Sequence, residues 1–506
     1  MLLILLDLMI CDNERKYKYS NYNVLSYDDI EMKHEVSYLI LENITEIGEG
    51  AFYGYRELGN VSLSSNLKII GGYAFSYCIN IKSIFIPSSV EQINQFAFFN
   101  CASLESFTFS ENSSLINIEE QVFSNCTKLK SISMPHSLKK IGVGAFFGCI
   151  NLESVIFSNE QKNLRLSLID KQAFENCIRL KTFSFPKCLS VIRESLFKNC
   201  SNLESVTFHE NSNISIISSS TFAYCIKLKS ILIISSVEEI GFNAFQKCLS
   251  LESIIVSGGN KNYSNYKNDG VLYDKNINKI IYFPISSSQT DFIIPNTVVS
   301  IDSFMFSNRN KLKSFSFLKQ SIVNSIGANA FMNCTNLTSI NFSNLINFIG
   351  IGAFSYCTKL EAIILPSRLS EILNKTFKEC SKLKLLMILS NISAIQDSAF
   401  LNCLNLKCIC YCGTKIPVIN SNAFSGCKNF ETVYINLTYP DKKFGSFNVT
   451  KTNDLLDICN SMLGSKLNVI KIAKITGICI GIFVFLVITM TILFFIVSKK
   501  KKKNKG

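Results

Sequence analysis

Fifteen phenylalanines recur along the chain at intervals of 23 to 28 residues, apart from one longer gap after Phe245. An isoleucine stands five residues before every one of them, and a cysteine stands three residues after all but two. Such a register indicates a row of repeated units rather than a set of unrelated domains. The anchors are Phe52, Phe75, Phe98, Phe123, Phe146, Phe174, Phe197, Phe222, Phe245, Phe306, Phe331, Phe354, Phe377, Phe400 and Phe424.

The second half of each unit has the L-x-x-L-x-L spacing of a leucine-rich repeat, as in Leu104, Phe107 and Phe109. The last two apolar positions are two residues apart and therefore share one face of a strand. The anchor and its cysteine are one helical turn apart, which predicts a short helical turn with both side chains pointing inward. One unit cannot bury its own apolar face, so the units must stack. The predicted fold class is an α/β repeat solenoid with a parallel β-sheet and short helical turns.

The unit at 141–157, Ile-Gly-Val-Gly-Ala-Phe-Phe-Gly-Cys-Ile-Asn-Leu-Glu-Ser-Val-Ile-Phe, resembles the BspA-like leucine-rich repeat family. The resemblance covers residues 37–440. It implies a surface protein of the kind found on bacteria and parasitic protists. It also implies a role in adhesion or in binding host proteins.

Two rows of polar residues are expected to face solvent at the start of the strands. Seven residues past the anchor, lysine and glutamate alternate over eight units, from Lys82 to Glu252. This alternation favours ion pairs between neighbouring strands, which fix register and solubility, over a role in ligand recognition. The next position is a row of hydroxyl residues: Ser83, Ser106, Ser131, Ser154, Thr182, Ser205, Ser230, Ser253, Ser314 and Ser339.

Two residues past the hydroxyl row, the side chain varies from unit to unit. Variable side chains on a regular scaffold are where a solenoid usually places recognition, whereas the hydroxyl row has simple packing as an equal alternative. Stacking of sugars or bases on this face would need more aromatic residues. The candidate interaction face comprises Phe85, Thr108, Ser133, Ile156, Thr207, Ile255, Asn341 and Tyr434.

The repeated cysteines indicate small buried residues in the turns rather than metal ligands or disulfides. Cys408, Cys410 and Cys412 fall outside this pattern, and a strand would aim all three thiols the same way. They are candidates for a disulfide to a neighbouring unit, with Cys403 or Cys427 as possible partners. A metal site is the weaker alternative, because the spacing is not C-x-x-C and no histidine is near.

The gap after Phe245 holds an insertion at 257–290. Its glycine- and asparagine-rich start, ending in Asp269-Gly270, indicates a loop, and the following segments predict a hairpin. Tyr263 and Tyr266 in this loop are candidate contact residues, with a register break between two halves of the solenoid as the alternative.

Residues 475–497 contain no charged side chain. As a helix rising ~1.5 Å per residue, they are long enough to cross a hydrocarbon core of ~30 Å. Lys499 to Lys503 follow directly, so the bias of positive charge predicts a single-pass type I protein of the cell membrane with an extracellular repeat domain. The predicted segments are a signal-like apolar stretch (1–12), an N-terminal cap (13–36), the solenoid (37–440), a linker (441–474), the transmembrane helix (475–497) and a basic tail (498–506).

Composition narrows the function further. The chain has only three histidines, no Gly-rich phosphate loop and no zinc motif, so the sequence favours neither an enzyme nor a cofactor. A basic excess concentrated in the tail does not suit nucleic-acid binding. The expected partner is an extracellular protein or glycoconjugate, and glycosylation sequons such as Asn43 and Asn262 suit a surface glycoprotein. Alternatives are a receptor that signals through a partner and a tail-anchored intracellular scaffold; the oligomeric state is open.

Overall fold

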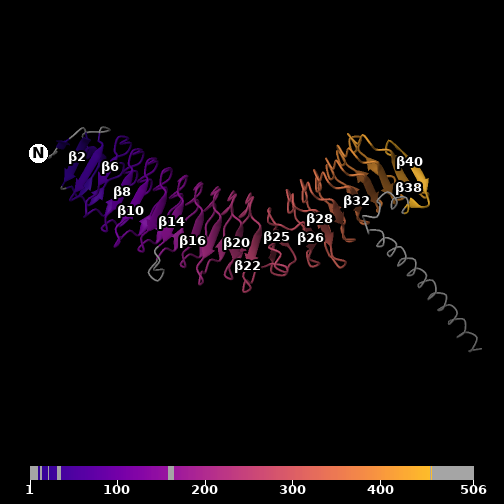
Figure 1. Ribbon diagram of the computed structural model, residues 1–506, viewed down its shortest axis with the longest axis horizontal. Helices are drawn as coiled ribbons and strands as arrows, with labels where there is room; N and C mark the ends of the chain where they lie inside the picture. The colour runs from indigo at the N-terminus through magenta and orange to yellow at the C-terminus, as the bar shows by residue number, and fades with distance from the viewer. Residues whose placement is uncertain are drawn as a thin grey trace, which may run out of the picture. The chain divides into compact units, whose positions relative to one another are not determined.

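The computed structural model describes residues 9–11, 14–20, 22–30, 36–157, 165–455 and 457. The chain divides into two compact units, Met1–Ser288 and Gln289–Gly506. In each unit the chain winds through successive coils, and each coil contributes one longer and one shorter strand that stack on the equivalent strands of the next coil (Figure 1).

After an initial antiparallel pair of β1 with β2, the longer strands of the first unit pair in parallel with a strand one coil away, in several separate sheets rather than in one continuous sheet. The pairing is in register, so that Ser106 lies opposite Ser83 and Phe107 opposite Ile84. The strands are β1 (Met9–Cys11), β2 (Glu14–Ser20), β4 (Tyr38–Glu42), β6 (Asn60–Ser62), β8 (Ser83–Ile86), β10 (Ser106–Phe109), β12 (Ser131–Met134), β14 (Ser154–Phe157), β16 (Thr182–Phe185), β18 (Ser205–Phe208), β20 (Ser230–Ile233) and β22 (Ser253–Val256).

The isoleucine of each repeat ends a two-residue strand, and these short strands form a second row of parallel pairs. They are β3 (Val24–Leu25), β5 (Glu46–Ile47), β7 (Ile69–Ile70), β9 (Gln92–Ile93), β11 (Asn117–Ile118), β13 (Lys140–Ile141), β15 (Leu168–Ile169), β17 (Val191–Ile192), β19 (Ile216–Ile217) and β21 (Glu239–Ile240). The 3-10 helix η1 (Tyr27–Asp29) precedes the first full coil.

The insertion folds as a small antiparallel sheet of β23 (Tyr263–Ser264), β24 (Leu272–Asp274) and β25 (Ile280–Tyr282). This confirms the predicted hairpin. Tyr282 donates a hydrogen bond of 2.9 Å to the carbonyl oxygen of Phe245, which ties the insertion to the last anchor of the first unit.

The second unit repeats the same pattern of parallel pairs, and β39 pairs antiparallel with β40 at its end. Its longer strands are β26 (Asp291–Ile294), β28 (Ser314–Phe317), β30 (Ser339–Asn341), β32 (Ala362–Leu365), β34 (Leu385–Ile388), β36 (Cys408–Tyr411), β38 (Thr432–Asn436) and β40 (Phe447–Thr452). Its shorter strands are β27 (Ser300–Ile301), β29 (Ser325–Ile326), β31 (Phe348–Ile349), β33 (Glu371–Ile372), β35 (Ala394–Ile395), β37 (Val418–Ile419) and β39 (Lys443–Phe444).

The anchor phenylalanines form a stack of parallel rings through the core of each unit. In the first unit, neighbouring ring centroids lie 5.1 to 5.9 Å apart from Phe52 to Phe245. In the second unit they lie 5.0 to 5.5 Å apart from Phe306 to Phe424. Each coil therefore completes its core only when its neighbours are present, as expected for a solenoid.

The thirteen repeat cysteines each make the same hydrogen bond. The thiol donates to the carbonyl oxygen of the anchor phenylalanine one coil earlier, at sulfur–oxygen distances of 3.0 to 3.2 Å. Cys149, for example, donates to Phe123. Desolvation by burial raises the pKa of Cys149 to about 12, so this thiol keeps the proton that it donates. The cysteines are structural, and they do more than fill space.

The predicted helical turns are wrong, and the fold is a parallel β-solenoid rather than an α/β solenoid. Phe75 and Cys78 point inward as expected, but Tyr73 and Tyr77 around them have φ angles of 56° and 60°. A right-handed helix requires negative φ, so two left-handed residues four apart exclude it. The amide of Phe75 instead donates to the carbonyl of Ala97 in the next coil at 2.7 Å.

The predicted fold class also included a C-terminal transmembrane helix, and this part is corrected as well. No helix among the described residues is both long and apolar enough to cross a membrane. The apolar stretch 475–497, on which the prediction rested, lies outside the described residues.

Candidate interaction face

The eight residues predicted to form the interaction face all lie on longer strands. Along each strand the side chains alternate between the core and the opposite side, so Ile84 and Ile86 are buried whereas Phe85 is 58% exposed. We call the residues equivalent to Phe85 the outer row. In the first unit these are Ser62, Phe85, Thr108, Ser133, Ile156, Ser184, Thr207, Leu232 and Ile255.

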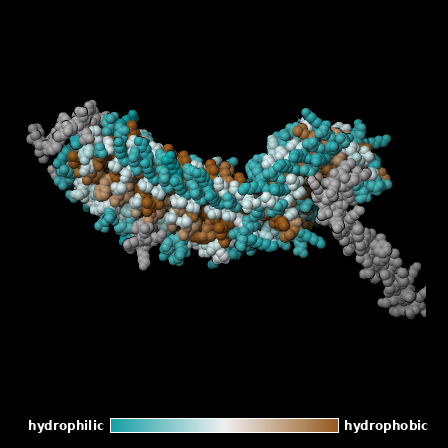
Figure 2. Space-filling model, viewed as in Figure 1, coloured by the Kyte–Doolittle hydropathy of each residue, from teal (hydrophilic) through white to brown (hydrophobic). Residues whose placement is uncertain are grey.

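Strand register brings neighbouring members of the outer row together. Phe85 lies opposite Thr108, Ser133 opposite Ile156, and Leu232 opposite Ile255. Ile156 and Ile255 are 50% and 52% exposed. Figure 2 shows hydrophobic residues gathered at the strands β20 and β22, where the adjacent Leu232 and Ile255 place two exposed aliphatic side chains side by side.

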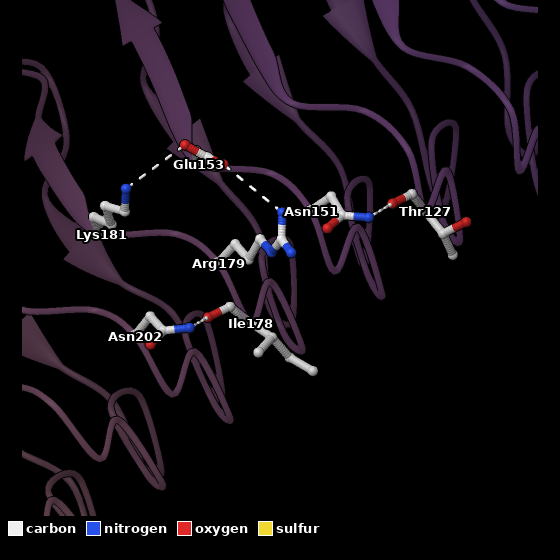
Figure 3. Close-up of polar contacts among 7 residues, drawn as sticks. All are labelled: Thr127, Asn151, Glu153, Ile178, Arg179, Lys181 and Asn202. Atoms are coloured by element: carbon white, nitrogen blue, oxygen red, sulfur yellow. Dashed lines mark hydrogen bonds and ion pairs between the residues drawn. The ribbon is translucent and has the colours of Figure 1, made fainter.

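The polar positions beside the outer row bind mainly to the solenoid itself. Glu153 lies 3.7 Å from Lys181 and 4.0 Å from Arg179, both from the next coil (Figure 3). Asn151 donates a hydrogen bond of 2.6 Å to the carbonyl of Thr127, one coil away. The side chains of Glu153, Arg179 and Lys181 are exposed to solvent. Each ion pair therefore stabilises the fold by about 0.2–1 kcal/mol at most. These contacts tie neighbouring coils to one another.

The outer row of the second unit differs from that of the first. Asn341 is exposed and Tyr434 is partly buried, but Met387 and Cys410 between them are almost completely buried. They belong to an apolar cluster on the outer side of β32, β34 and β36 that also contains Leu455, from beyond the last strand. Leu455 therefore covers part of this face, and Tyr434 is partly buried against the same cluster.

The three neighbouring cysteines Cys408, Cys410 and Cys412 differ in their bonding and environment. Cys410 is disulfide-bonded. Burial raises the pKa of the Cys408 thiol and that of the Cys412 thiol to about 11. The suggested partners Cys403 and Cys427 are not in a disulfide, because both thiols take part in the repeated thiol–carbonyl bonds.

The two candidate tyrosines of the insertion are engaged within the chain. The hydroxyl oxygen of Tyr263 accepts a hydrogen bond of 3.0 Å from the amide of Ile240. The ammonium group of Lys267 lies 5.1 Å from the ring centroid of Tyr266. Both side chains are half-buried, so the loop positions them as part of the fold before any contact with a ligand.

The face offers hydroxyl groups and a few exposed apolar side chains rather than a group of residues arranged for catalysis. Within the described ranges, no group of three or more His, Cys, Asp or Glu residues is arranged to hold a metal ion. Sequence reasoning missed the outer-row members Ser184, Leu232 and Ile293, although each occupies the same repeat position as its neighbours. Ile293 is 55% exposed on β26.

Comparison with known proteins identifies the repeat family. The family model of the BspA type leucine rich repeat region matches residues 45–168, 163–275 and 275–407. A leucine rich cell surface protein from Faecalibacterium prausnitzii is 27% identical, with a TM-score of 0.45, over 80% of this chain and 92% of its own. The pneumococcal vaccine antigen PcpA is 21% identical, with a TM-score of 0.43, over 76% and 85%. The search of curated proteins found no match.

Proposed function

Because this chain belongs to the family of BspA-type leucine-rich repeat proteins, we propose that it is a binding protein of the cell surface that mediates adhesion. Its ligand is an extracellular protein or glycoconjugate, and its role is recognition rather than catalysis. Solenoids present extended surfaces on which side chains vary while the scaffold stays constant. Many weak contacts along such a surface gain strength when many copies act together on one cell.

The observation that supports this proposal is the outer row of the first unit. Its members are in register, exposed and chemically different from coil to coil, while the inward-facing residues beside them are buried or partly buried. Phe85, Ile156, Leu232 and Ile255 expose between 40% and 58% of their surface. A folded solenoid gains nothing from apolar side chains in water, so these four residues are the expected anchors of an interface.

Adhesion of cells that express the full chain tests the proposal. The probes are immobilised extracellular-matrix proteins and fixed epithelial cells. Changing Phe85, Ile156, Leu232 and Ile255 together to serine should reduce the number of adherent cells about tenfold, since interface anchors often contribute 1 kcal/mol or more each. Phe242→Ser is the matched control, because this residue is 82% exposed next to the short strand β21. Equal loss in both variants, or no loss in the fourfold variant, would contradict the role of the outer row.

Exposure of the repeat domain outside the cell is a separate part of the proposal. An epitope tag between Lys267 and Asn268, both exposed in the insertion, should be stained on intact cells. A glycosidase should shift the chain on a gel if sequons such as Asn262 are used. Staining only after permeabilisation, without a glycosidase shift, would sink the adhesion proposal and favour an intracellular role.

A further inference from the structure

Five aromatic side chains form a continuous cluster in the turns of the first coils, between the short and the long strands. The rings of Tyr73 and Phe96 stack at 4.8 Å with an angle of 5°. Phe99 contacts Phe96 at 5.7 Å and Tyr77 at 5.5 Å, and Tyr77 contacts Tyr53 at 5.5 Å. We call Tyr53, Tyr73, Tyr77, Phe96 and Phe99 the aromatic cluster. All five rings are at least partly exposed, and Tyr53 is 46% exposed.

The cluster is not required by the repeat. In later coils of the first unit, the positions equivalent to Tyr73 and Phe96 are occupied by Gln121, Gly144, Gln172, Ser195, Ser220 and Asn243. The position equivalent to Tyr77 is Asn or Gly in most coils, as in Asn125 and Gly148. The solenoid therefore closes its turns equally well without aromatic residues.

Backbone conformation makes the aromatic residues unfavourable at these positions. Tyr73, Tyr77 and Phe96 have φ angles of 56°, 60° and 58°. The left-handed region suits Gly and Asn, and a bulky residue there is an outlier. Because neither burial nor backbone preference explains these rings, they point to a role at the surface.

The surroundings of the cluster are acidic, although the whole chain carries a formal net charge of +13. Residues 38–125 contain nine acidic and three basic side chains. Glu49, in the coil of Tyr53, and Glu120, in the coil after that of Phe96, occupy the same repeat position. The amide of Phe96 donates to the carbonyl of Glu120 at 2.9 Å. Glu119 is already paired with Lys140 at 2.7 Å. In the described part of the chain, neither Glu49 nor Glu120 has an ion-pair partner.

The second unit contains an internal example of the contact that such a surface can make. Tyr356 occupies the repeat position of Tyr77, with the same left-handed backbone. The ammonium group of Lys378, from the next coil, lies 5.5 Å from its ring centroid. Cations are attracted to the faces of aromatic rings, and nearby carboxylates add to this attraction.

We propose that the aromatic cluster, together with Glu49 and Glu120, binds a lysine- or arginine-bearing segment of a partner protein. The basic side chains would lie over the exposed rings and pair with the two carboxylates. This site lies in the turns and shares no residue with the outer row, so the two surfaces can be tested independently.

Fluorescence anisotropy of a labelled peptide with alternating lysine and alanine, titrated with the purified full chain, tests the proposal. The variant with Tyr73→Asn, Tyr77→Asn and Phe96→Asn should bind about tenfold more weakly, since each exposed cation–ring contact gives a few-fold in affinity. The pair Glu49→Gln and Glu120→Gln should also weaken binding, and higher salt should weaken the wild type. Asparagine is the residue that the repeat itself uses at left-handed positions, so the aromatic variant should unfold at the same temperature as the wild type or above it.

Tyr224→Asn is the matched control, because Tyr224 has a φ of 63° and is 41% exposed in a distant coil of the same unit. It should leave the affinity unchanged. Failure of the wild type to bind the lysine peptide, or equal binding by the aromatic variant, would overturn the proposal. Binding of maltohexaose that depends on the aromatic residues but not on Glu49 and Glu120 would overturn the class of partner and assign the cluster to a neutral glycan.

Discussion

Replacing one repeat cysteine with serine and with alanine distinguishes a bonded thiol from a simple filler. Cys149 is completely buried, and its thiol donates to the carbonyl of Phe123 at 3.1 Å. Cys149→Ala removes both the sulfur and the donor. Loss of a group a little larger than a methylene costs about 0.8 kcal/mol, and loss of a hydrogen bond costs about 0.5–1 kcal/mol, so we expect a destabilisation of about 1–2 kcal/mol.

Cys149→Ser keeps a donor next to the same carbonyl, so it should be no more destabilising than alanine. If the cysteine only filled space, serine would bury an unsatisfied hydroxyl and should be worse than alanine by about 1–3 kcal/mol. Urea unfolding of the full chain, followed by circular dichroism, measures the difference. The variants Cys357→Ser and Cys357→Ala repeat the test in the second unit, where the thiol of Cys357 donates to the carbonyl of Phe331 at 3.2 Å. A less stable serine variant at both sites would refute the role of the bond.

Three further predictions concern the pH dependence of stability, the close approach of neighbouring backbones and an exposed ion pair. The free energy of unfolding should fall as pH rises above about 9, because the pKa of Cys149 is raised from 9.0 to about 12 in the folded chain and the unfolded thiol ionises first. Urea midpoints measured between pH 8 and pH 10 test this expectation, and midpoints that do not change with pH would contradict it. Gly142→Ala should destabilise by about 1–3 kcal/mol, because a Cβ there would lie 2.6 Å from the backbone of Glu119, whereas Gly258→Ala meets nothing within 4 Å and should be neutral in the same urea assay. Lys181→Ala should change stability by about 0.5 kcal/mol or less, since its pair with Glu153 is exposed, and a larger loss in thermal unfolding would show that the pair is structural.

Much of the fold could be predicted from spacing alone. The positions of the Ile, Phe and Cys residues indicated stacked coils, and the alternation along each strand indicated which side chains face outward. The turn was mispredicted because a separation of three residues fits both a helical turn and a tight loop. The frequent Asn and Gly two residues after the anchor, as in Asn100 and Gly148, carried the signal of a left-handed residue that excludes the helix.

The candidate face was less predictable, since its burial depends on segments that are remote in sequence. Met387 and Cys410 occupy outer-row positions, yet the segment that contains Leu455 helps to cover them. No local pattern predicts such a contact, because Leu232 and Ile255 are successive apolar residues at the same repeat position and stay exposed. The aromatic cluster was missed because its members occupy different positions in adjacent coils and meet only when the coils stack.

The repeated thiol–carbonyl bond has a consequence for how the protein can vary in length. Each such contact between coils joins a cysteine thiol to a phenylalanine carbonyl oxygen, whether between Cys101 and Phe75 or between Cys380 and Phe354. If a coil is duplicated or deleted, the coils that become neighbours can therefore form the same thiol–carbonyl hydrogen bond. The length of the solenoid can then change in steps of ~4.8 Å, the spacing of adjacent strands. The outward side chains can be substituted independently of this change in length.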